Sequence, residues 1–499
     1  MRQRLGGLYS LASGALLVLG FAPLGWWPLS LLLLGAWLAC WASARPGQAL
    51  RQGFWLGLGL YLAGVSWVFV SVHVYGGAPA WMAVILVLAL AAYLASFLAL
   101  AIGAAWWLCP PGALRWLLAL PACWVFAEHA RGSILDGFPW LGLGYLLQPA
   151  PGASALLPLG GVALLGVAVW WLAAAVPLLR ARRPVPALAP AALLMAAAGV
   201  LPAASHYTQA RGAPLPAALV QGNMPQDQKW LPENLLPTVE LYDALTAPLT
   251  QPLVIWPEVA IPASRFRVEG WFRRWQEQSA ARGQTLLAGI ITRQQERPYN
   301  TVYALGPRPG RYVKQQLVPF GEYFPVPDWM RPVVDWLELP ISDIRTDMAA
   351  DRYLWAGDTP LALSICFESV FPHKFARQAQ GSGLLVNVTN DAWFAGTLAP
   401  QQHLQIARTR AAETGRPLLR VANTGISAAI DANGGLEATL PWGQRGVLET
   451  TVQPRQGQTP YMRWLDAPLT WWAGSMLLLL LARRVVSIPA IRARAPDES

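Results

Sequence analysis

The stretch LSICFESVFP, residues 363–372, places a cysteine directly after an apolar run that has the length and composition of a buried β-strand. Two other stretches end in the same manner: VIWPEVAIP (254–262) leads to Glu258, and YVKQQLVPFGEYFP (312–325) contains Lys314. In layered α/β domains, residues just past the carboxyl ends of strands converge on one edge, where sites are built. We therefore expect an α/β fold in which a carboxylate, an ammonium group and a thiol meet.

These three groups have a shared chemical logic. Cysteine reacts as the thiolate, which needs a base to take its proton or a nearby cation to lower its pKa. Glu258 can serve as the base, and Lys314 can stabilise the thiolate and then the oxyanion that forms when a carbonyl is attacked. Lysine is rare in this chain, which has only Lys229, Lys314 and Lys374. The pattern predicts acyl transfer through a thioester on Cys366.

Around these stretches, residues 205 to 465 form a mixed polar region that holds nearly all of the acidic residues and indicates a water-soluble domain. The predicted strands lie at 217–223, 252–258, 285–292, 300–306, 312–319, 360–368, 383–391, 418–425 and 426–435, and helical periodicity occurs around 232–247, 266–282, 370–380 and 401–415. Most of the strands are apolar on both faces, which favours sheets that helices cover on their outer sides. DANGG, residues 431–435, predicts a hairpin turn.

The rest of the chain has the composition of a membrane protein: overall, 55% of residues are hydrophobic, 13% are charged and the mean hydropathy is +0.35. A helix of roughly 20 apolar residues crosses a hydrocarbon layer of about 30 Å. Eight apolar runs fit this pattern, at 8–24, 27–43, 53–74, 81–107, 113–129, 156–178, 187–203 and 467–482. The second run follows the first after almost no polar spacer, so we expect the first run to be a membrane helix rather than a cleavable signal.

The arginines between these runs predict the orientation, because short cytoplasmic loops retain basic residues. With the amino terminus inside, the loops that carry Arg45 and Arg51, Arg115, and residues 180–183 all lie in the cytoplasm, and only Arg131 disagrees. Residue 205 onward then lies on the outer side. The net charge of +10 reflects these clusters rather than a basic patch in the soluble domain, so we expect no nucleic-acid partner.

No metal or other cofactor is expected. The four cysteines form no CxxC pair, and the five histidines share no metal-ligand spacing. Three of the cysteines, Cys40, Cys109 and Cys123, lie in apolar segments and are interpreted as buried thiols.

Glu258, Lys314 and Cys366, with gaps of 56 and 52 residues, resemble the Glu-Lys-Cys triad of the nitrilase superfamily, and they lie in the motifs WPE, KQQLVPFGE and CFE. Together with the apolar runs they resemble, more specifically, the apolipoprotein N-acyltransferases, enzymes of the bacterial inner membrane. The resemblance covers the whole chain. It implies a membrane α-helical bundle of about eight transmembrane helices plus an extracytoplasmic nitrilase-like α/β/β/α sandwich domain. The implied domains are 1–204 (seven helices), 205–465 (catalytic, periplasmic) and 466–499 (last helix and cytoplasmic tail).

The resemblance also implies roles for individual residues. Glu258 would be the general base, Lys314 the transition-state stabiliser and Cys366 the nucleophile. Five further residues are expected to support the site or contact substrate: Glu322, Glu368, Trp230, Phe367 and Asn300. Phe367 departs from the family pattern, in which many members have tyrosine, so its hydroxyl is missing here.

Two segments near the expected site carry motifs of their own. NVTND, residues 387–391, is interpreted as a strand end that leads into a site loop. DAWFAG, residues 391–396, is either a loop over the pocket mouth that touches lipid or a packed surface turn.

The implied reaction moves a fatty acyl chain from a phospholipid resembling phosphatidylethanolamine, through a cysteine thioester, to the α-amine of the S-diacylglyceryl cysteine of an apolipoprotein. The enzyme is expected to be a monomer. Two alternatives stay open: a membrane-tethered hydrolase that uses water as the acceptor, and a transporter whose external domain binds ligand. The second would require polar residues within the crossings, and the runs hold few.

Overall fold

The computed structural model describes residues 2–294, 297–323, 329, 343–394 and 396–492. The chain divides into two compact units. The helical unit comprises Met1–Ser66, Ile85–Leu201 and Trp464–Ser499, and the sandwich unit comprises Trp67–Val84 and Pro202–Arg463.

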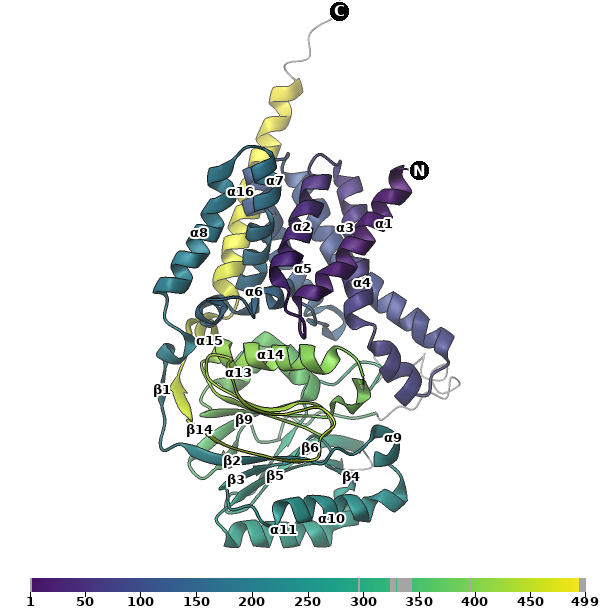
Figure 1. Cartoon of the computed structure of the whole chain (residues 1–499), viewed down its shortest axis with the longest axis vertical. Coiled ribbons are helices and arrows are strands. Elements are labelled where there is room, and N and C mark those ends of the chain that lie inside the picture. Colours follow the sequence, from purple (N-terminus) through teal and green to yellow (C-terminus); the bar gives the residue numbers. More distant parts are fainter. Residues whose placement is uncertain (1, 295–296, 324–328, 330–342, 395, 493–499) are drawn as a thin grey trace, which may run out of the picture. The chain divides into compact units, whose positions relative to one another are not determined.

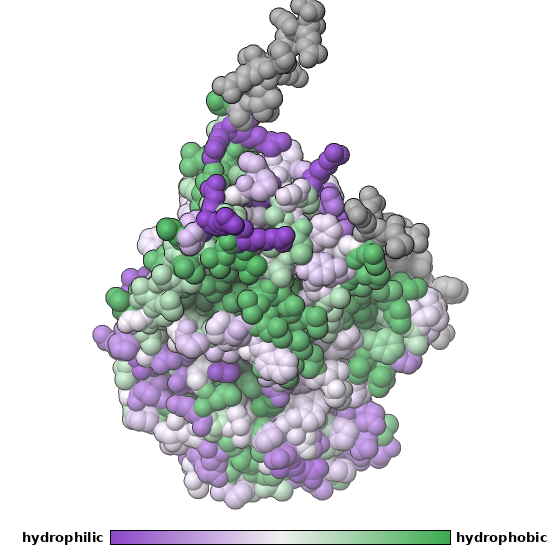
Figure 2. All heavy atoms as spheres, turned by 45° about the horizontal axis from the view of Figure 1, so that its top comes forward, coloured by the Kyte–Doolittle hydropathy of each residue, from purple (hydrophilic) through white to green (hydrophobic). Residues whose placement is uncertain are grey.

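The helical unit is built from apolar α-helices (Figure 1). Their bounds are α1 (Arg2–Leu17), α2 (Trp27–Trp41), α3 (Pro46–Val65), α4 (Ala80–Leu108), α5 (Leu120–Arg131), α6 (Ala153–Ala173), α7 (Ala175–Arg180), α8 (Pro184–Val200) and α16 (Ala467–Arg492). Figure 2 shows hydrophobic side chains, in green, gathered over these helices, and hydrophilic ones, in purple, at one end of the bundle. This distribution is typical of helices that lie in lipid.

Each of the eight predicted apolar runs contains a helix. Three helices are long and apolar enough to cross a membrane: Ala80–Leu108, Ala153–Arg180 and Ala467–Val486. Three shorter apolar helices span Leu5–Gly20, Trp27–Trp41 and Pro184–Val200. The count of eight crossings therefore stays a prediction.

The helix predicted over 53–74 was wrong in its bounds, because α3 begins at Pro46 and ends at Val65. Proline is well accommodated in the first turn of a helix, where its missing N–H has no intrahelical partner in any case. The polar side chain of Gln52 then lies inside the bundle and accepts a hydrogen bond from Ser10 Oγ of α1 at 2.9 Å. The hydropathy pattern leaves this first part of α3 out of the predicted helix. In the fold, the hydrogen bond from Ser10 satisfies the polar side chain of Gln52.

Glycines let α1 and α3 pack backbone against backbone. A Cβ atom at Gly14 of α1 would lie 1.8 Å from the carbonyl oxygen of Leu56, and one at Gly59 of α3 would lie 1.9 Å from that of Leu11. Small residues of this kind allow close helix contact in membranes, where the hydrophobic effect does not drive association.

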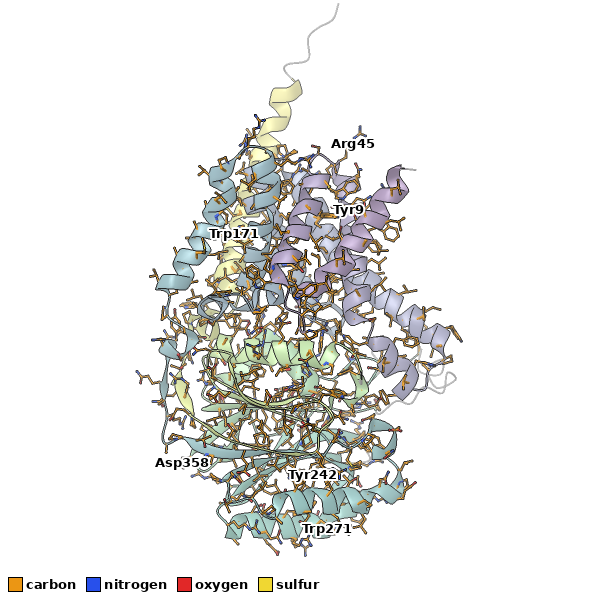
Figure 3. All side chains as sticks on the ribbon, viewed as in Figure 1. Tyr9, Arg45, Trp171, Tyr242, Trp271 and Asp358 are labelled. Atoms are coloured by element: carbon orange, nitrogen blue, oxygen red, sulfur yellow. The ribbon has the colours of Figure 1, made fainter. Side chains whose placement is uncertain are left out.

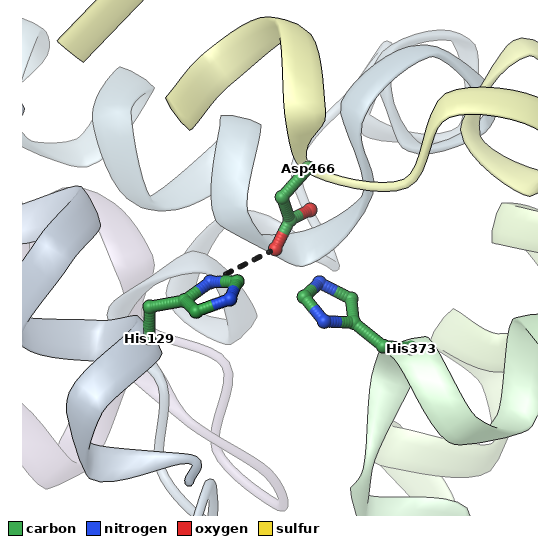
Figure 4. Close-up of side chains that lie close together, drawn as sticks. All are labelled: His129, His373 and Asp466. Atoms are coloured by element: carbon green, nitrogen blue, oxygen red, sulfur yellow. Dashed lines mark ion pairs between the residues drawn. The ribbon is translucent and has the colours of Figure 1, made fainter. Parts of the chain in front are cut away.

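Helix α16 packs against α5 and α6 within the same unit. Trp472 of α16 meets Trp171 of α6 edge to face, with ring centroids 6.3 Å apart (Figure 3). His129 of α5 and Asp466, which precedes α16, approach to 3.9 Å (Figure 4). The final helix of the chain is therefore part of this bundle rather than a separate anchor.

Arg131, the one basic residue at odds with the predicted orientation, is fully buried. Its guanidinium donates to the carbonyl oxygens of Phe138 at 2.6 Å and Trp140 at 2.7 Å, and it pairs with Glu128. Its charge therefore holds the loop after α5, so Arg131 is a structural residue and its position does not bear on the predicted orientation.

The sandwich unit contains two main sheets. The strands of the seven-stranded sheet are β14 (Gly446–Val452), β2 (Leu215–Gln221), β3 (Leu253–Ile255), β5 (Thr285–Gln294), β6 (Arg297–Leu305) and β7 (Gly310–Val313) in spatial order, with β4 (Ile261–Ser264) also paired to β5. The six-stranded sheet has the order β13 (Leu436–Leu440), β12 (Ser427–Ile430), β11 (Leu418–Ala422), β10 (Leu384–Thr389), β9 (Thr359–Ile365) and β8 (Leu354–Ala356). Two short strands, β1 (Thr208–Ala210) and β15 (Arg455–Gly457), form an antiparallel pair.

The two sheets pack face to face and helices cover both outer faces (Figure 1). The helices are α9 (Gln226–Lys229), α10 (Leu235–Thr246), α11 (Glu269–Ala281), α13 (Pro372–Ala379), α14 (Ala399–Thr414) and α15 (Pro460–Trp464). Along β2, Leu219 enters the core between the sheets, while its neighbour Val220 packs under α10 and α11. The same alternation on β10 sends Val386 inward and Leu385 toward α13 and α14. Both faces of these strands are buried, so the α/β/β/α layering agrees with the apolar strand pattern.

Most core strands and helices of the sandwich overlap their predicted positions, but the strand predicted over 312–319 is wrong in its bounds, because β7 ends at Val313. In the DANGG turn, the Asp431 N–H donates to the Gly435 carbonyl, and the Asp431 carbonyl accepts from the Gly434 N–H. Six strands among the described residues were not predicted: β1, β4, β8, β13, β14 and β15. Several of these are short or carry polar residues on exposed faces, as in β13.

Candidate active site

Cys366 lies at the first residue after β9, where the strand turns into a short 3₁₀ helix (Cys366–Val370). Its φ is +52°, a left-handed conformation that side chains other than glycine rarely adopt. Strain of this kind persists only where surrounding contacts impose it. Cys366 therefore lies in the turn and not in the strand, and 9% of its surface is exposed.

Glu368 holds this turn against the end of β7. Its carboxylate accepts hydrogen bonds from the backbone N–H groups of Ile365 (2.6 Å), Gln315 (2.6 Å) and Gln316 (3.0 Å), and from the Tyr312 hydroxyl (3.0 Å). Burial raises the pKa of Glu368, although the three backbone donors oppose that rise. These bonds hold the turn that carries Cys366, and the supporting role of Glu368 in the reaction stays a prediction.

Glu258 follows β3 and is buried. The Trp256 side chain packs between Tyr242 of α10 (5.0 Å between ring centroids) and Trp275 of α11 (4.9 Å). This packing holds in place the backbone that leads to Glu258. Tyr242 and the neighbouring Trp271 are marked in Figure 3. The packing of Trp256 against α10 and α11 thus fixes the position of the WPE turn after β3.

The carboxylate of Glu258 gathers three donors. Its Oε1 accepts from Asn300 Nδ2 at 2.8 Å and from Lys314 Nζ at 3.3 Å. Its Oε2 accepts from the backbone N–H of Asn390 at 3.0 Å, so the loop after β10 reaches the site as the NVTND motif predicted.

Lys314 joins two carboxylates. Its Nζ lies 2.8 Å from Glu322 Oε1 and 3.3 Å from Glu258 Oε1, and the side chain is 1% exposed. Burial alone would lower the pKa of Lys314, but Glu322 and Glu258 outweigh it and raise that pKa above the ordinary value. The ammonium form is therefore held at all physiological pH values.

The thiol of Cys366 is shifted toward its protonated form. Burial is the largest cause and raises the pKa of Cys366; Glu258 raises it further, and Lys314 opposes both. A resting thiol that is protonated needs a base before it can attack, and Glu258 is the carboxylate whose charge acts most strongly on it.

Three predicted residues remain: Glu322, Phe367 and Trp230. Glu322 also accepts the Val318 N–H at 2.8 Å, which fixes the PFGE turn beside Lys314. Phe367 is buried and packs edge to face on Phe371 at 5.2 Å. Trp230, at the end of α9, is 51% exposed and so belongs to the surface rather than to the buried carboxylate cluster.

Sequence reasoning missed Lys229, which neighbours Trp230. Its buried Nζ lies 3.4 Å from the carbonyl oxygen of Glu258. Burial lowers the pKa of Lys229 to about 8, with Glu258 acting in the opposite direction. The rarity of lysine in the chain is a signal that could have pointed to it.

The DAWFAG segment is partly packed. Phe394 meets Trp67 with ring centroids 4.7 Å apart, and the Trp393 carbonyl accepts a bond from Ser71 Oγ at 2.9 Å. Residues 67–84 belong to the same unit as this loop. Trp393 itself stays 37% exposed, and Ala395 lies outside the described residues. The packed-turn alternative thus describes Phe394, and lipid contact by Trp393 stays a prediction.

Comparison with known proteins is consistent with this geometry. Residues 13–175 match the family model described as the apolipoprotein N-acyltransferase N-terminal domain, and residues 216–461 match the one described as carbon-nitrogen hydrolase. Three curated proteins named apolipoprotein N-acyltransferase are similar over nearly their whole length. They come from Azotobacter vinelandii (40% identity, 98% of each chain), Methylococcus capsulatus (39%, 96% of each) and Pseudomonas syringae pv. tomato (38%, 93% of this chain and 94% of the relative). With both domains matched and identity of this level across the full chain, the protein belongs to the apolipoprotein N-acyltransferase family.

Proposed function

We propose that this protein transfers a fatty acyl chain from a membrane phospholipid, through a thioester on Cys366, to the α-amine of the N-terminal S-diacylglyceryl cysteine of apolipoproteins. One observation carries the proposal: Glu258 and Lys314 are bonded to each other and both act electrostatically on the Cys366 thiol. These contacts support the assignment of Glu258 as base, Lys314 as stabilising cation and Cys366 as nucleophile.

In the first half-reaction Glu258 takes the thiol proton as Cys366 Sγ bonds to the ester carbonyl carbon. Lys314 stabilises the oxyanion of the tetrahedral intermediate. The ester C–O bond then breaks, the proton passes from Glu258 to the leaving oxygen, and lysophospholipid departs. The fatty acyl thioester remains on the enzyme.

In the second half-reaction the acceptor α-amine attacks the thioester carbonyl. Glu258 takes a proton from the nitrogen as the C–N bond forms, the C–S bond breaks, and Glu258 passes the proton to Sγ, which returns the Cys366 thiol. An amine attacks a thioester readily and the amide product is more stable, so the sequence runs downhill.

The lipid substrates explain why a helical bundle accompanies the catalytic domain. Each buried CH₂ contributes about 0.8 kcal/mol, so neither substrate leaves the bilayer for a distant site. In our proposal residues 1–204 and 466–499 form an eight-helix membrane domain in the bacterial inner membrane, and residues 205–465 form a periplasmic catalytic domain. The donor is a phospholipid resembling phosphatidylethanolamine, and the enzyme acts as a monomer without a metal or other cofactor.

Intact-protein mass spectrometry tests the thioester. Purified wild-type protein incubated with phospholipid alone should gain the mass of one acyl chain, and Cys366→Ala should gain none. Cys40→Ser is the control and should be acylated normally. Cys40 is exposed, so the expectation that it is a buried thiol was wrong. A normal adduct on Cys366→Ala would remove this residue from the reaction.

Addition of a diacylated lipopeptide distinguishes the acyltransferase from a hydrolase. We expect N-acylated peptide and lysophospholipid in equal amounts. Release of free fatty acid without acylated peptide would instead assign water as the acceptor.

A further inference from the structure

The backbone carbonyl of Cys366 is surrounded by polar side chains behind the nucleophile. Ser369 Oγ donates to this oxygen at 3.0 Å, His403 Nε2 lies 3.2 Å from it and Asn387 Nδ2 lies 3.5 Å from it. These contacts converge on a residue whose φ is +52°. The direction of the carbonyl is thereby set by Ser369 of the same turn and by two groups from other parts of the sandwich, His403 and Asn387.

A buried ion pair holds these groups. Asp391 Oδ2 and Arg420 are 2.7 Å apart, and both side chains are fully buried. The other oxygen of Asp391 lies 3.1 Å from His403 Nδ1, and Arg420 also donates to Asn387 Oδ1 at 2.5 Å. Strands β10 and β11, the loop after β10 and helix α14 each contribute one member.

Within this group, Asp391 is ionised and His403 is neutral. Burial alone would raise the pKa of Asp391, but Arg420 and then His403 outweigh it and hold that pKa far below its ordinary value. Burial and Arg420 lower the pKa of His403 against the opposing effect of Asp391. An ionised pair therefore carries a neutral imidazole.

Either tautomer of the neutral ring ties the ion pair to the turn. With the proton on Nδ1, His403 donates to Asp391, and Nε2 accepts the Ser369 hydroxyl proton at 2.9 Å, which Ser369 then no longer donates to the Cys366 carbonyl. With the proton on Nε2, the ring donates to the Cys366 carbonyl and Nδ1 accepts from Arg420 at 3.1 Å. The ring is thus the link between the ion pair and the strained turn.

We infer that His403, carried by the Asp391–Arg420 ion pair, is a positioning residue that imposes the left-handed turn of Cys366 and so presents the thiol to the ester carbonyl. The inference rests on the proposed role of Cys366 as the nucleophile. His403 does not exchange protons with substrate in this scheme. It acts through the backbone of Cys366, since small displacements of a reacting group cost large factors in rate.

The experiment compares His403→Leu, His403→Gln and the control His206→Gln, which changes an exposed histidine of the same unit. Two rates are measured on full-length protein: acyl-enzyme formation from phospholipid, and alkylation of Cys366 by iodoacetamide. We expect His403→Leu to lower the maximal acylation rate about 100-fold while the KM for phospholipid changes less than threefold. His403→Gln, which restores one polar contact, should recover part of the loss.

Alkylation separates this inference from the proposed function. If no variant, wild type included, forms an acyl adduct, the proposed function fails, yet a slower alkylation of Cys366 in His403→Leu still supports positioning. Wild-type acylation and alkylation rates in His403→Leu would overturn the inference. So would equal losses in the Leu and Gln variants that match their loss of thermal stability. Should His403→Leu not fold, His403→Gln against His206→Gln decides the same question on the ratio of maximal rate to KM.

Discussion

At the scale of single residues, the site depends on where protons rest. The Cys366 thiol keeps its proton because burial and Glu258 raise its pKa, whereas Lys314 keeps its charge because two carboxylates face it. A site poised in this way has little free thiolate between turnovers, which limits side reactions of the sulfur. In the proposed mechanism, Glu258 therefore has to take the thiol proton in the same step in which Cys366 Sγ attacks the ester carbonyl.

Lys229 makes a prediction about stability and pH. Its pKa is lowered to about 8 in the folded protein, against an ordinary value of 10.5. Between these values the unfolded chain binds more protons, so the Lys229 contribution to the free energy of unfolding rises with pH from about 8 to about 10.5. The full rise is about 3 kcal/mol.

Thermal unfolding of purified protein across pH 7 to 10.5 checks this prediction. Lys229→Met should be more stable than wild type at pH 7, and the difference should shrink as the pH approaches 10.5. Lys374→Met, at an exposed position, controls for the loss of a lysine. A stability difference between wild type and Lys229→Met that stays constant over this range would contradict the assignment.

At the scale of elements, the contact between α1 and α3 depends on glycine. A Cβ at Gly14 would lie 1.8 Å from a backbone oxygen, so the helices would have to separate. We expect Gly14→Ala to lower the thermal stability of the protein by a clear margin, equivalent to about 2 kcal/mol or more.

Gly199 of α8 provides the matched control. No atom lies within 4 Å of a Cβ built there, so Gly199→Ala should leave stability unchanged or raise it by about 0.5–1 kcal/mol through helix propensity. The measurement is the unfolding temperature of both variants in the same detergent. Equal temperatures for the two variants would show that α1 and α3 do not need the close approach.

At the scale of the whole molecule, the proposed topology puts the arginine loop between α7 and α8 in the cytoplasm and the sandwich unit in the periplasm. Single cysteines at Arg182 and Asp358 test this placement. Both positions are exposed, and Asp358 is marked in Figure 3. An impermeant maleimide applied to spheroplasts should label Asp358→Cys directly and Arg182→Cys only after permeabilisation. Labelling of both from outside would refute the proposed orientation.

Local patterns in the sequence were enough to identify the two kinds of unit and to predict the residues that meet at the candidate site. Hydropathy marks membrane helices because lipid requires about 20 apolar residues in a row. Strand ends mark Glu258, Lys314 and Cys366 because parallel strands bring their carboxyl ends to one edge. The bounds of α3 escaped this reasoning, since Gln52 is satisfied by Ser10 on another helix.

The sequence by itself determined that the chain is a membrane protein with an α/β domain, and it predicted a Glu-Lys-Cys triad there, because each of those signals lies within a few consecutive residues. Only the tertiary structure decided which other groups act on them. His403 reaches Cys366 from 37 residues away along the chain, and Lys229 lies 29 residues from Glu258. Sheet register and helix packing, rather than any local pattern, bring such side chains together and settle which of them are charged, because burial and neighbouring charges set each pKa.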